Sequence, residues 1–325
     1  MTFPRRQFLR LAGGAMALPA TARLARAQAY PTRPVRLIVG AIAGSAPDVI
    51  ARLIAQWLQE QLGQPFVVEN REGANGVIGA EIVVRSPPDG YTLLLISAAD
   101  TIDPSLFATP SFNFRHDIAP IANAVRLPAV ITVNPSLPYK TLAEFIAYAK
   151  ANPDQINIGA PGIGSPQYVA GELFMMMTDT KIAMISYRGG PPAITDAVSG
   201  QIQGMIGTVL LVIDHVRSGN LRAIAVTSTA RSELLPDVPT VAEQVPGFDA
   251  NQWIGFGAPR DTPADVIDKL NKEINAALAD ATIKARVAAL GGMMLSGTPA
   301  EFGAFLTEET DKWAKVVKFS GAKAN

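Results

Sequence analysis

The stretch Val35-Arg-Leu-Ile-Val-Gly-Ala-Ile-Ala-Gly-Ser-Ala-Pro-Asp48, with residues 49–62 behind it, decides the fold. Residues 35–39 form a β-branched run that predicts a short strand buried on both faces. Residues 49–62 repeat apolar side chains with helical spacing and stop at Gly63, which predicts an amphipathic helix. Ser45 and Asp48 have the spacing of a capping box, so we expect Ser45 at the N-cap and Asp48 to bond back to it.

The small-residue loop between this strand and helix is a candidate anion site. The start of a helix carries unpaired N–H groups and roughly half a positive charge, so it can hold an anion without lysine or arginine. An ordinary turn of an α/β protein is the alternative for this stretch taken alone.

Composition indicates a well-packed protein of two ordinary domains. The chain has 325 residues, of which 48% are apolar and 17% charged, and these proportions are far from those of disordered chains. There is no cysteine, which excludes disulfides, thiolate nucleophiles and cysteine metal sites.

The N-terminus has the pattern of an export signal. Arg5-Arg6-Gln-Phe-Leu-Arg10 is a twin-arginine pattern, and a mildly apolar run leads to the small-residue site Ala27-Gln-Ala29. We expect residues 1–29 to be a signal peptide cleaved after about Ala29, with the mature protein in the periplasm. A cytosolic amphipathic helix is the alternative. The whole chain has 28 basic and 28 acidic residues, and residues 1–29 contain five arginines and no acid. The mature protein would therefore have a net charge of −5, which argues against nucleic acid as a partner.

Strands and helices alternate along most of the remaining chain. Residues 66–69 and 91–96 read as strands around a helix at 77–85, whereas residues 100–127 show no clear period. We expect the chain to enter a second domain near residues 124–130 and to return along a strand at 251–259.

The second domain repeats the opening pattern twice. Strands at 156–158 and 182–186 each lead through a glycine loop into a helix that starts with proline, at Ser165-Pro166 and at Pro191-Pro192. Parallel sheets bind ligands at the carboxyl ends of their strands. We therefore expect helix N-termini to face one another across a cleft.

Catalytic and metal-binding motifs are missing from the sequence. It has no phosphate-loop lysine, no dinucleotide pattern and no nucleophile elbow, and His116 and His215 lack companions at triad spacing. Asp100 and Asp103 stand at i, i+3, where a turn role is favoured over metal ligation. We expect no cofactor, no metal and no enzymatic activity. A periplasmic hydrolase whose triad assembles only in the folded chain is the remaining enzyme alternative.

Motifs along nearly all of residues 30–325 resemble the Bug family, the solute receptors of tripartite tricarboxylate transporters. They are Gly44 with Asp48-Val-Ile-Ala-Arg52, Val68-Glu-Asn-Arg71, Gly73-Ala-Asn-Gly76, Asp89-Gly-Tyr-Thr-Leu93, Gly164-Ser-Pro-Gln167, Tyr187-Arg-Gly189 and Asp237-Val-Pro-Thr240.

The resemblance implies an α/β, two-lobed periplasmic-binding-protein (Venus flytrap) fold, each lobe a mainly parallel sheet flanked by helices. Lobe 1 would comprise residues 30–127 plus 253–325, and lobe 2 residues 128–252. It also implies a monomeric receptor that delivers a small di-, tri- or aromatic carboxylate to a large and a small integral membrane subunit. Signalling to a membrane sensor kinase is an alternative output.

Carried over from the family, residues 43–46 and 160–165 look like a pincer around the carboxylate, with residues 187–190 on the distal side. The candidate ligand-binding residues are Ala43, Gly44, Ser45, Ala46, Asp48, Ser97, Ala160, Gly162, Gly164, Ser165, Gln167, Tyr187, Arg188, Gly189, Gly190 and Thr208. The chain departs from the family pattern at Gly40, Ala41, Ser45, Pro47 and Tyr168, which leaves the ligand open.

Overall fold

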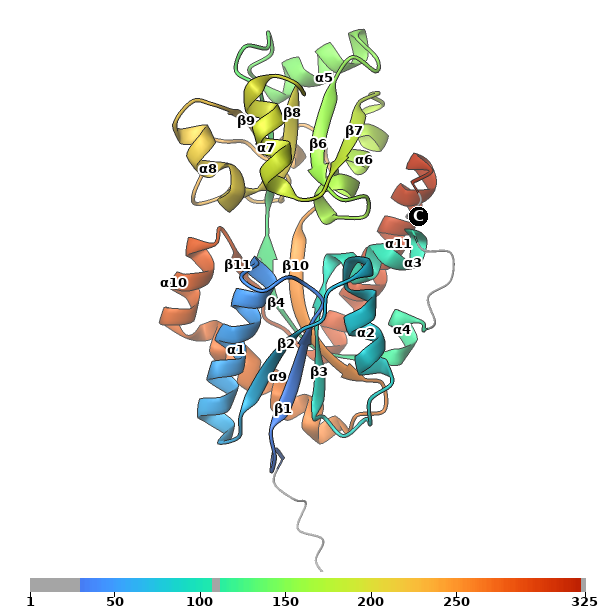
Figure 1. Ribbon diagram of the computed structural model, residues 1–325, viewed down its shortest axis with the longest axis vertical. Helices are drawn as coiled ribbons and strands as arrows, with labels where there is room; N and C mark the ends of the chain where they lie inside the picture. The colour runs from blue at the N-terminus through green and yellow to red at the C-terminus, as the bar shows by residue number, and fades with distance from the viewer. Residues whose placement is uncertain (1–29, 107–111, 323–325) are drawn as a thin grey trace, which may run out of the picture.

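The computed structural model describes residues 30–106 and 112–322, which form two lobes, each built on one sheet with helices against it (Figure 1). The expected signal peptide, 1–29, lies outside the described residues. None of the helices in the described part of the chain combines the length and hydropathy needed to cross a bilayer.

The sheet of lobe 1 has six strands in the order β11-β4-β10-β3-β1-β2. Strand β1 pairs in parallel with β2 and β3, whereas β10 is antiparallel to both of its neighbours. The strands are β1 (Val35–Val39), β2 (Phe66–Asn70), β3 (Thr92–Ser97), β4 (Ile118–Leu127), β10 (Gln252–Pro259) and β11 (Met293–Met294).

The sheet of lobe 2 has five strands in the order β7-β6-β8-β5-β9. Strand β6 is parallel to β7 and β8, and β5 is antiparallel to β8 and β9. The strands are β5 (Ala129–Val133), β6 (Asn157–Pro161), β7 (Ala183–Tyr187), β8 (Gly204–Thr208) and β9 (Arg222–Val226). The two-lobed α/β architecture is confirmed, but both sheets are mixed rather than mainly parallel, because the chain crosses between lobes on strands that run against their neighbours.

Helices cover both faces of each sheet (Figure 1). They are α1 (Ala46–Leu62), α2 (Val77–Val84), α3 (Ala98–Leu106), α4 (Phe114–Asp117), α5 (Leu142–Ala151), α6 (Pro166–Thr178), α7 (Gly190–Ser199), α8 (Val209–Arg217), α9 (Ala264–Ala279), α10 (Ala281–Ala289) and α11 (Pro299–Ser320), with short 3-10 turns at Ala74–Gly76 and Val241–Glu243.

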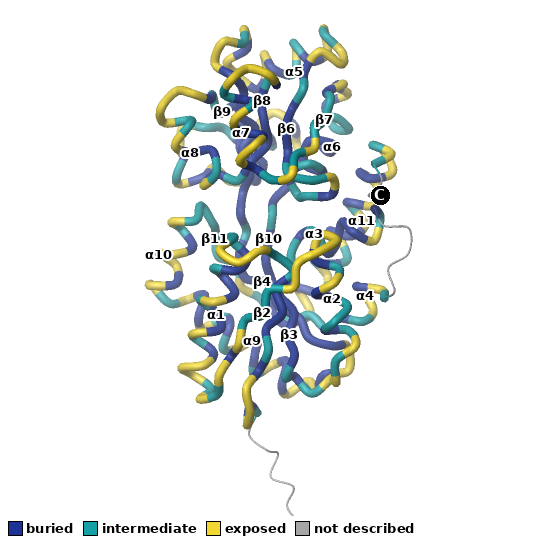
Figure 2. The backbone as a smooth tube through the Cα atoms, in the orientation of Figure 1, coloured by how far each residue is buried: buried dark blue, intermediate teal, exposed yellow. Residues whose placement is uncertain are grey.

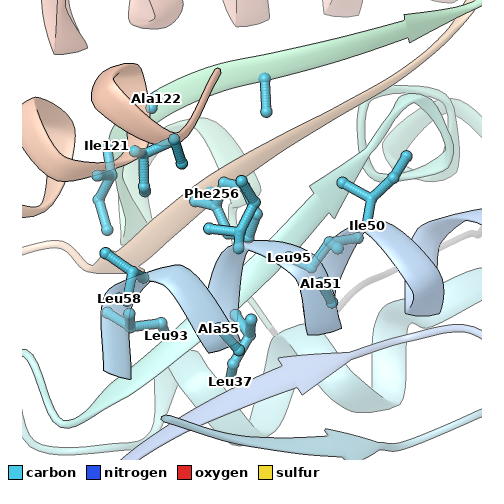
Figure 3. Packing of buried hydrophobic residues seen from close by; sticks show 14 of the residues in the cluster. Leu37, Ile50, Ala51, Ala55, Leu58, Leu93, Leu95, Ile121, Ala122 and Phe256 are labelled. Carbon is cyan, nitrogen blue, oxygen red and sulfur yellow. The ribbon is translucent and has the colours of Figure 1, made fainter. Parts of the chain in front are cut away.

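The apolar face of α1 packs as its spacing predicts. Ile50, Ala51, Ala55 and Leu58 lie against the sheet residue Leu37 and its neighbours in the core of lobe 1 (Figure 3). The helix ends at Gly63, whose φ of 73° is the left-handed conformation that glycine adopts without a Cβ penalty.

The segment 100–127, which shows no period in the sequence, holds α3, α4 and the ten-residue strand β4. The sequence pattern does not reveal strand β4, because its pairing with β10 shifts register twice, between Ile254 and Gly255 and between Phe256 and Gly257. Each shift breaks the alternation of inward and outward side chains by which a strand is recognised. The chain then passes into the second sheet at Pro128 and returns at residue 251.

Helix α11 contacts both lobes. Its body packs on β4, while Trp313, Val316 and Val317 near its end join the hydrophobic core of lobe 2 together with Phe174 of α6. Ile102 of α3 belongs to the same core. The end of the chain therefore ties the lobes together beside the two strand crossings.

A binding cleft between the lobes

Two adjoining cavities lie where the lobes face each other, and both are lined by Ala41, Pro47 and Gln252. The small compartment has a volume of about 150 Å³ and the large compartment about 610 Å³. Exposed loops, 42–44 and 71–75 among them, border this region on the lobe 1 side (Figure 2).

Helix N-termini converge on the small compartment. Pro47 lies in the first turn of α1, Gly76 precedes α2, Ala99 lies in the first turn of α3, and Pro166 opens α6 in the other lobe. The first N–H groups of each helix have no intrahelical acceptor and carry the positive end of the helix dipole. Four such ends from two lobes favour an anion between them.

The large compartment lies between the starts of α1 and α8 and beside the crossing at Pro128. Thr208 stands at the N-cap of α8 without a side-chain cap hydrogen bond within the described part of the chain. The lining residues are Ala41, Ser45, Ala46, Pro47, Leu127, Pro128, Thr208, Leu210, Leu211, Gln252 and Leu290.

The expected capping box at α1 does not form. Ser45 takes the N-cap position, but its hydroxyl donates to the Ile42 carbonyl at 2.7 Å and makes no cap bond. Asp48 instead accepts from the Gly44 N–H at 2.8 Å and from Arg52 and Asn70. Burial opposes its ionisation, but these hydrogen bonds hold the pKa of Asp48 below its usual value. The carboxylate of Asp48 thus ties the loop before α1 to that helix and to the end of β2.

The expected cap at α6 does form. Ser165 accepts from the Tyr168 N–H at 3.1 Å, and Pro166 occupies the first turn. The preceding loop approaches lobe 1 closely: Asn75 Nδ2 lies 3.5 Å from the Ile163 carbonyl, and a Cβ on Gly164 would collide with Leu106. Glycine at 164, with φ at 91°, is therefore required both by the backbone and by the neighbouring lobe.

Two buried aspartates lie on α3 beside the small compartment. Asp100 lines it and accepts from the N–H and hydroxyl of Ser97, at 2.7 and 3.1 Å. Asp103 accepts only from Asn75, at 3.3 Å, and its Oδ2 has no partner among the described residues. Burial raises the pKa of Asp100 to about 6, and burial together with the charge of Asp100 raises the pKa of Asp103 to about 9. The described residues contain no cluster of three potential metal ligands.

Of the candidate residues, Ser45, Ala46, Ser97 and Thr208 line the two compartments. The others line neither compartment: Ala43, Gly44, Asp48, Ala160, Gly162, Gly164, Ser165, Gln167, Tyr187, Arg188, Gly189 and Gly190. Ligand binding stays a prediction for all of the candidate residues.

The expected distal segment, residues 187–190, makes contacts within lobe 2. The Tyr187 hydroxyl donates to Asp196 at 2.8 Å, and burial together with this bond raises the pKa of Tyr187 to about 12. Arg188 is exposed, and Gly190 leaves room for Leu211, with which a Cβ would collide.

Sequence reasoning missed Gln252, the half-buried polar side chain that both compartments share. Its position in the sequence could have identified it, because Gln252 lies at the beginning of the strand that was expected to return to lobe 1. It also missed the start of α8, because a helix between residues 208 and 221 was not anticipated.

The departure at Gly40 has a packing reason. A Cβ on Gly40 would lie 2.6 Å from the Gly76 Cα, so only glycine lets the loop after β1 and the turn before α2 touch. The neighbouring Ala41 lines both compartments.

The model of the tripartite tricarboxylate transporter family receptor (TctC) matches residues 50–321. The chain belongs to this family. Protein BugT of Bordetella pertussis (strain Tohama I) is 39% identical over 300 residues, 91% of this chain and 92% of BugT.

Two solved structures show the same fold over the whole of their length. R. palustris Rpa4515 with adipate has a TM-score of 0.78 and 32% identity, covering 91% of this chain and 100% of that one. The periplasmic binding protein BugD has a TM-score of 0.75 and 34% identity, with the same coverage. The TctC-family protein described here is thus a solute-binding receptor and not an enzyme, and its relatives are periplasmic.

Proposed function

We propose that this receptor captures a small organic carboxylate in the cleft and delivers it to the large and small membrane subunits of a tripartite transporter. The observation that carries the proposal is the convergence of helix N-termini from both lobes on one compartment. Such ends attract an anion and supply N–H donors for it without a basic side chain. The adipate in Rpa4515 supports the same ligand class.

The proposal includes the place of action. Twin-arginine export of a chain cleaved after about Ala29 would deliver a monomeric receptor to the periplasm, where relatives such as BugD act. Two crossings between the lobes permit closure by hinge motion around the ligand.

Calorimetry on the mature protein tests the ligand class with adipate and its neutral diamide. The acid should bind and stabilise the fold by RT ln(1 + [L]/Kd), about 2.7 kcal/mol at a hundredfold excess over Kd. The diamide should bind at least about tenfold more weakly, since it cannot use the helix dipoles. Binding of neutral or cationic solutes in preference to every carboxylate tried would refute the proposal.

A charge variant tests the position of the site. Ala46, in the first turn of α1, lines the large compartment, and Ala46→Asp would place a negative charge beside the bound anion. We expect carboxylate affinity to fall about tenfold or more. Gln59→Asp, on the exposed face of the same helix, is the matched control and should leave affinity unchanged. Equal affinities in both variants would place the site elsewhere.

A further inference from the structure

Gln252 supplies the polar side chain of the wall that the two compartments share. In the part of the chain that the structure describes, the other residues lining both compartments are Ala41 and Pro47, whose side chains form no hydrogen bonds. Gln252 pairs with Leu127 in the register of β10 and β4, so it lies where both strands cross between the lobes. A ligand that extends from the small compartment into the large one therefore passes this side chain.

The neighbouring Trp253 fixes the direction of the Gln252 side chain. Trp253 is 1% exposed, its ring meets Phe302 of α11 edge-on, and its indole N–H donates to Glu309 at 3.0 Å. Successive side chains of a strand point to opposite faces of the sheet. Gln252 is therefore held on the face opposite α11, where it lines the large compartment together with the first turn of α1.

The Gln252 amide is available to a ligand. In the described part of the chain the side chains of Gln252 and Thr208 form no hydrogen bond, and Thr208 lines the large compartment alone. The other polar side chains of the two walls are hydrogen-bonded to neighbouring residues: Ser45 to Ile42, Asn75 to Asp103, and Ser97 to Asp100.

A ligand that covers Gln252 has to form a hydrogen bond with it. The side chain is half-buried in the cleft, and closure of the lobes around a ligand displaces the water that the amide would otherwise bind. An unsubstituted hydrocarbon segment leaves the amide unpaired, which weakens binding by about tenfold. A hydroxyl group avoids this loss, because it can donate to the amide oxygen or accept from the amide N–H, whichever way the amide is turned.

Resting on the carboxylate-receptor function proposed above, we infer that Gln252 is a specificity-determining residue that binds a hydroxyl group of the ligand. The carboxylate of the ligand meets the helix N-termini, and the hydroxyl lies on the carbons that pass between the two compartments. Gln252 favours a hydroxycarboxylate over the unsubstituted acid of the same skeleton, whether that acid carries one, two or three carboxylates.

Three pairs of acids test this specificity: malate with succinate, citrate with tricarballylate, and mandelate with phenylacetate. Each pair differs by one hydroxyl group, and together they cover di-, tri- and aromatic carboxylates. By calorimetry on the mature protein, the hydroxy acid of each pair that binds should bind about tenfold more tightly than its partner. Equal binding within the pairs, or tighter binding of the unsubstituted acids, would overturn this inference and leave the carboxylate function standing. Binding of none of the six acids would overturn both.

A substitution assigns the preference to Gln252. Gln252→Met keeps the length of the side chain without its amide, so it should bring the ratio of affinities within a pair close to one. Gln59→Met, at an exposed position of α1, is the matched control and should keep the ratio of the natural protein. An unchanged ratio in Gln252→Met would overturn the assignment.

A charged variant tests the position of Gln252 independently of its amide. Gln252→Glu keeps an acceptor for the hydroxyl but adds a negative charge beside the ligand. It should therefore weaken both acids of a pair by about tenfold, and the hydroxy acid should remain the tighter ligand. Gln59→Glu should leave both affinities unchanged. Natural affinities in Gln252→Glu would show that the ligand does not reach this side chain.

Discussion

Asp103 on α3 should make the receptor less stable as the pH rises through the neutral range. Its side chain is 4% exposed, its Oδ2 lacks a partner among the described residues, and its pKa is raised to about 9 by burial and by the nearby Asp100. An aspartate in the unfolded chain has a pKa near 3.8. Below that value the carboxyl is protonated in both states, so it imposes no penalty.

Between pH 3.8 and about 9 the unfolded chain releases this proton while the folded chain keeps it. The free energy of unfolding therefore falls by about 1.4 kcal/mol per pH unit, and by about 4 kcal/mol in total at pH 7. Above pH 9 the carboxyl is ionised in both states, so the loss stays constant.

Asp103→Asn removes this titration and keeps the shape. The amide oxygen can still accept from Asn75 Nδ2, which lies 3.3 Å from Asp103 Oδ1, but the new amide N–H groups cost about 1–3 kcal/mol at every pH if they stay unpaired. The variant should therefore gain about 4 kcal/mol relative to the natural protein between pH 4.5 and 7.5.

Urea unfolding at pH 4.5, 6 and 7.5 measures this difference, and Asp268→Asn, at an exposed position of α9, is the control. Parallel stability curves for the natural protein and Asp103→Asn would show that the carboxyl ionises normally in the fold and would refute the reasoning.

Two stability predictions concern other buried contacts. Glu309→Ala should lower the free energy of unfolding by about 3 kcal/mol, because the indole N–H groups of Trp253 and Trp313 both donate to Glu309 Oε2 at 3.0 Å and would be left unpaired. The control is Glu308→Ala at the exposed neighbouring position, which should stay within about 0.5 kcal/mol of the natural protein. Equal urea midpoints for the two variants would contradict this prediction. Ser165→Ala should cost about 1 kcal/mol by removing the α6 cap, and thermal unfolding at an unchanged temperature would count against it.

Local signals predicted the ends of elements well. Gly63 ends α1 in the left-handed conformation, and Ser165-Pro166 starts α6. These features depend on residues within one turn of each other, so the sequence displays them directly.

Features that depend on tertiary neighbours were not predictable in the same way. Asp48 matched the capping-box spacing, but Arg52 and Asn70 compete for its carboxylate once the fold brings them together. Gln252 lines both compartments only because the two lobes meet beside it. The family resemblance supplied the two-lobed fold, and of the candidate residues only Ser45, Ala46, Ser97 and Thr208 line the two compartments in the described part of the chain.

The placement of α11 across both lobes should restrict the directions in which the lobes can separate. Two chain crossings alone would permit bending and twisting about several axes. Because α11 and α3 also pack against α6 on one flank, that flank acts as a spine (Figure 1). On the opposite flank α1 and α8 border the large compartment, so we expect a solute to enter and leave the cleft beside α8.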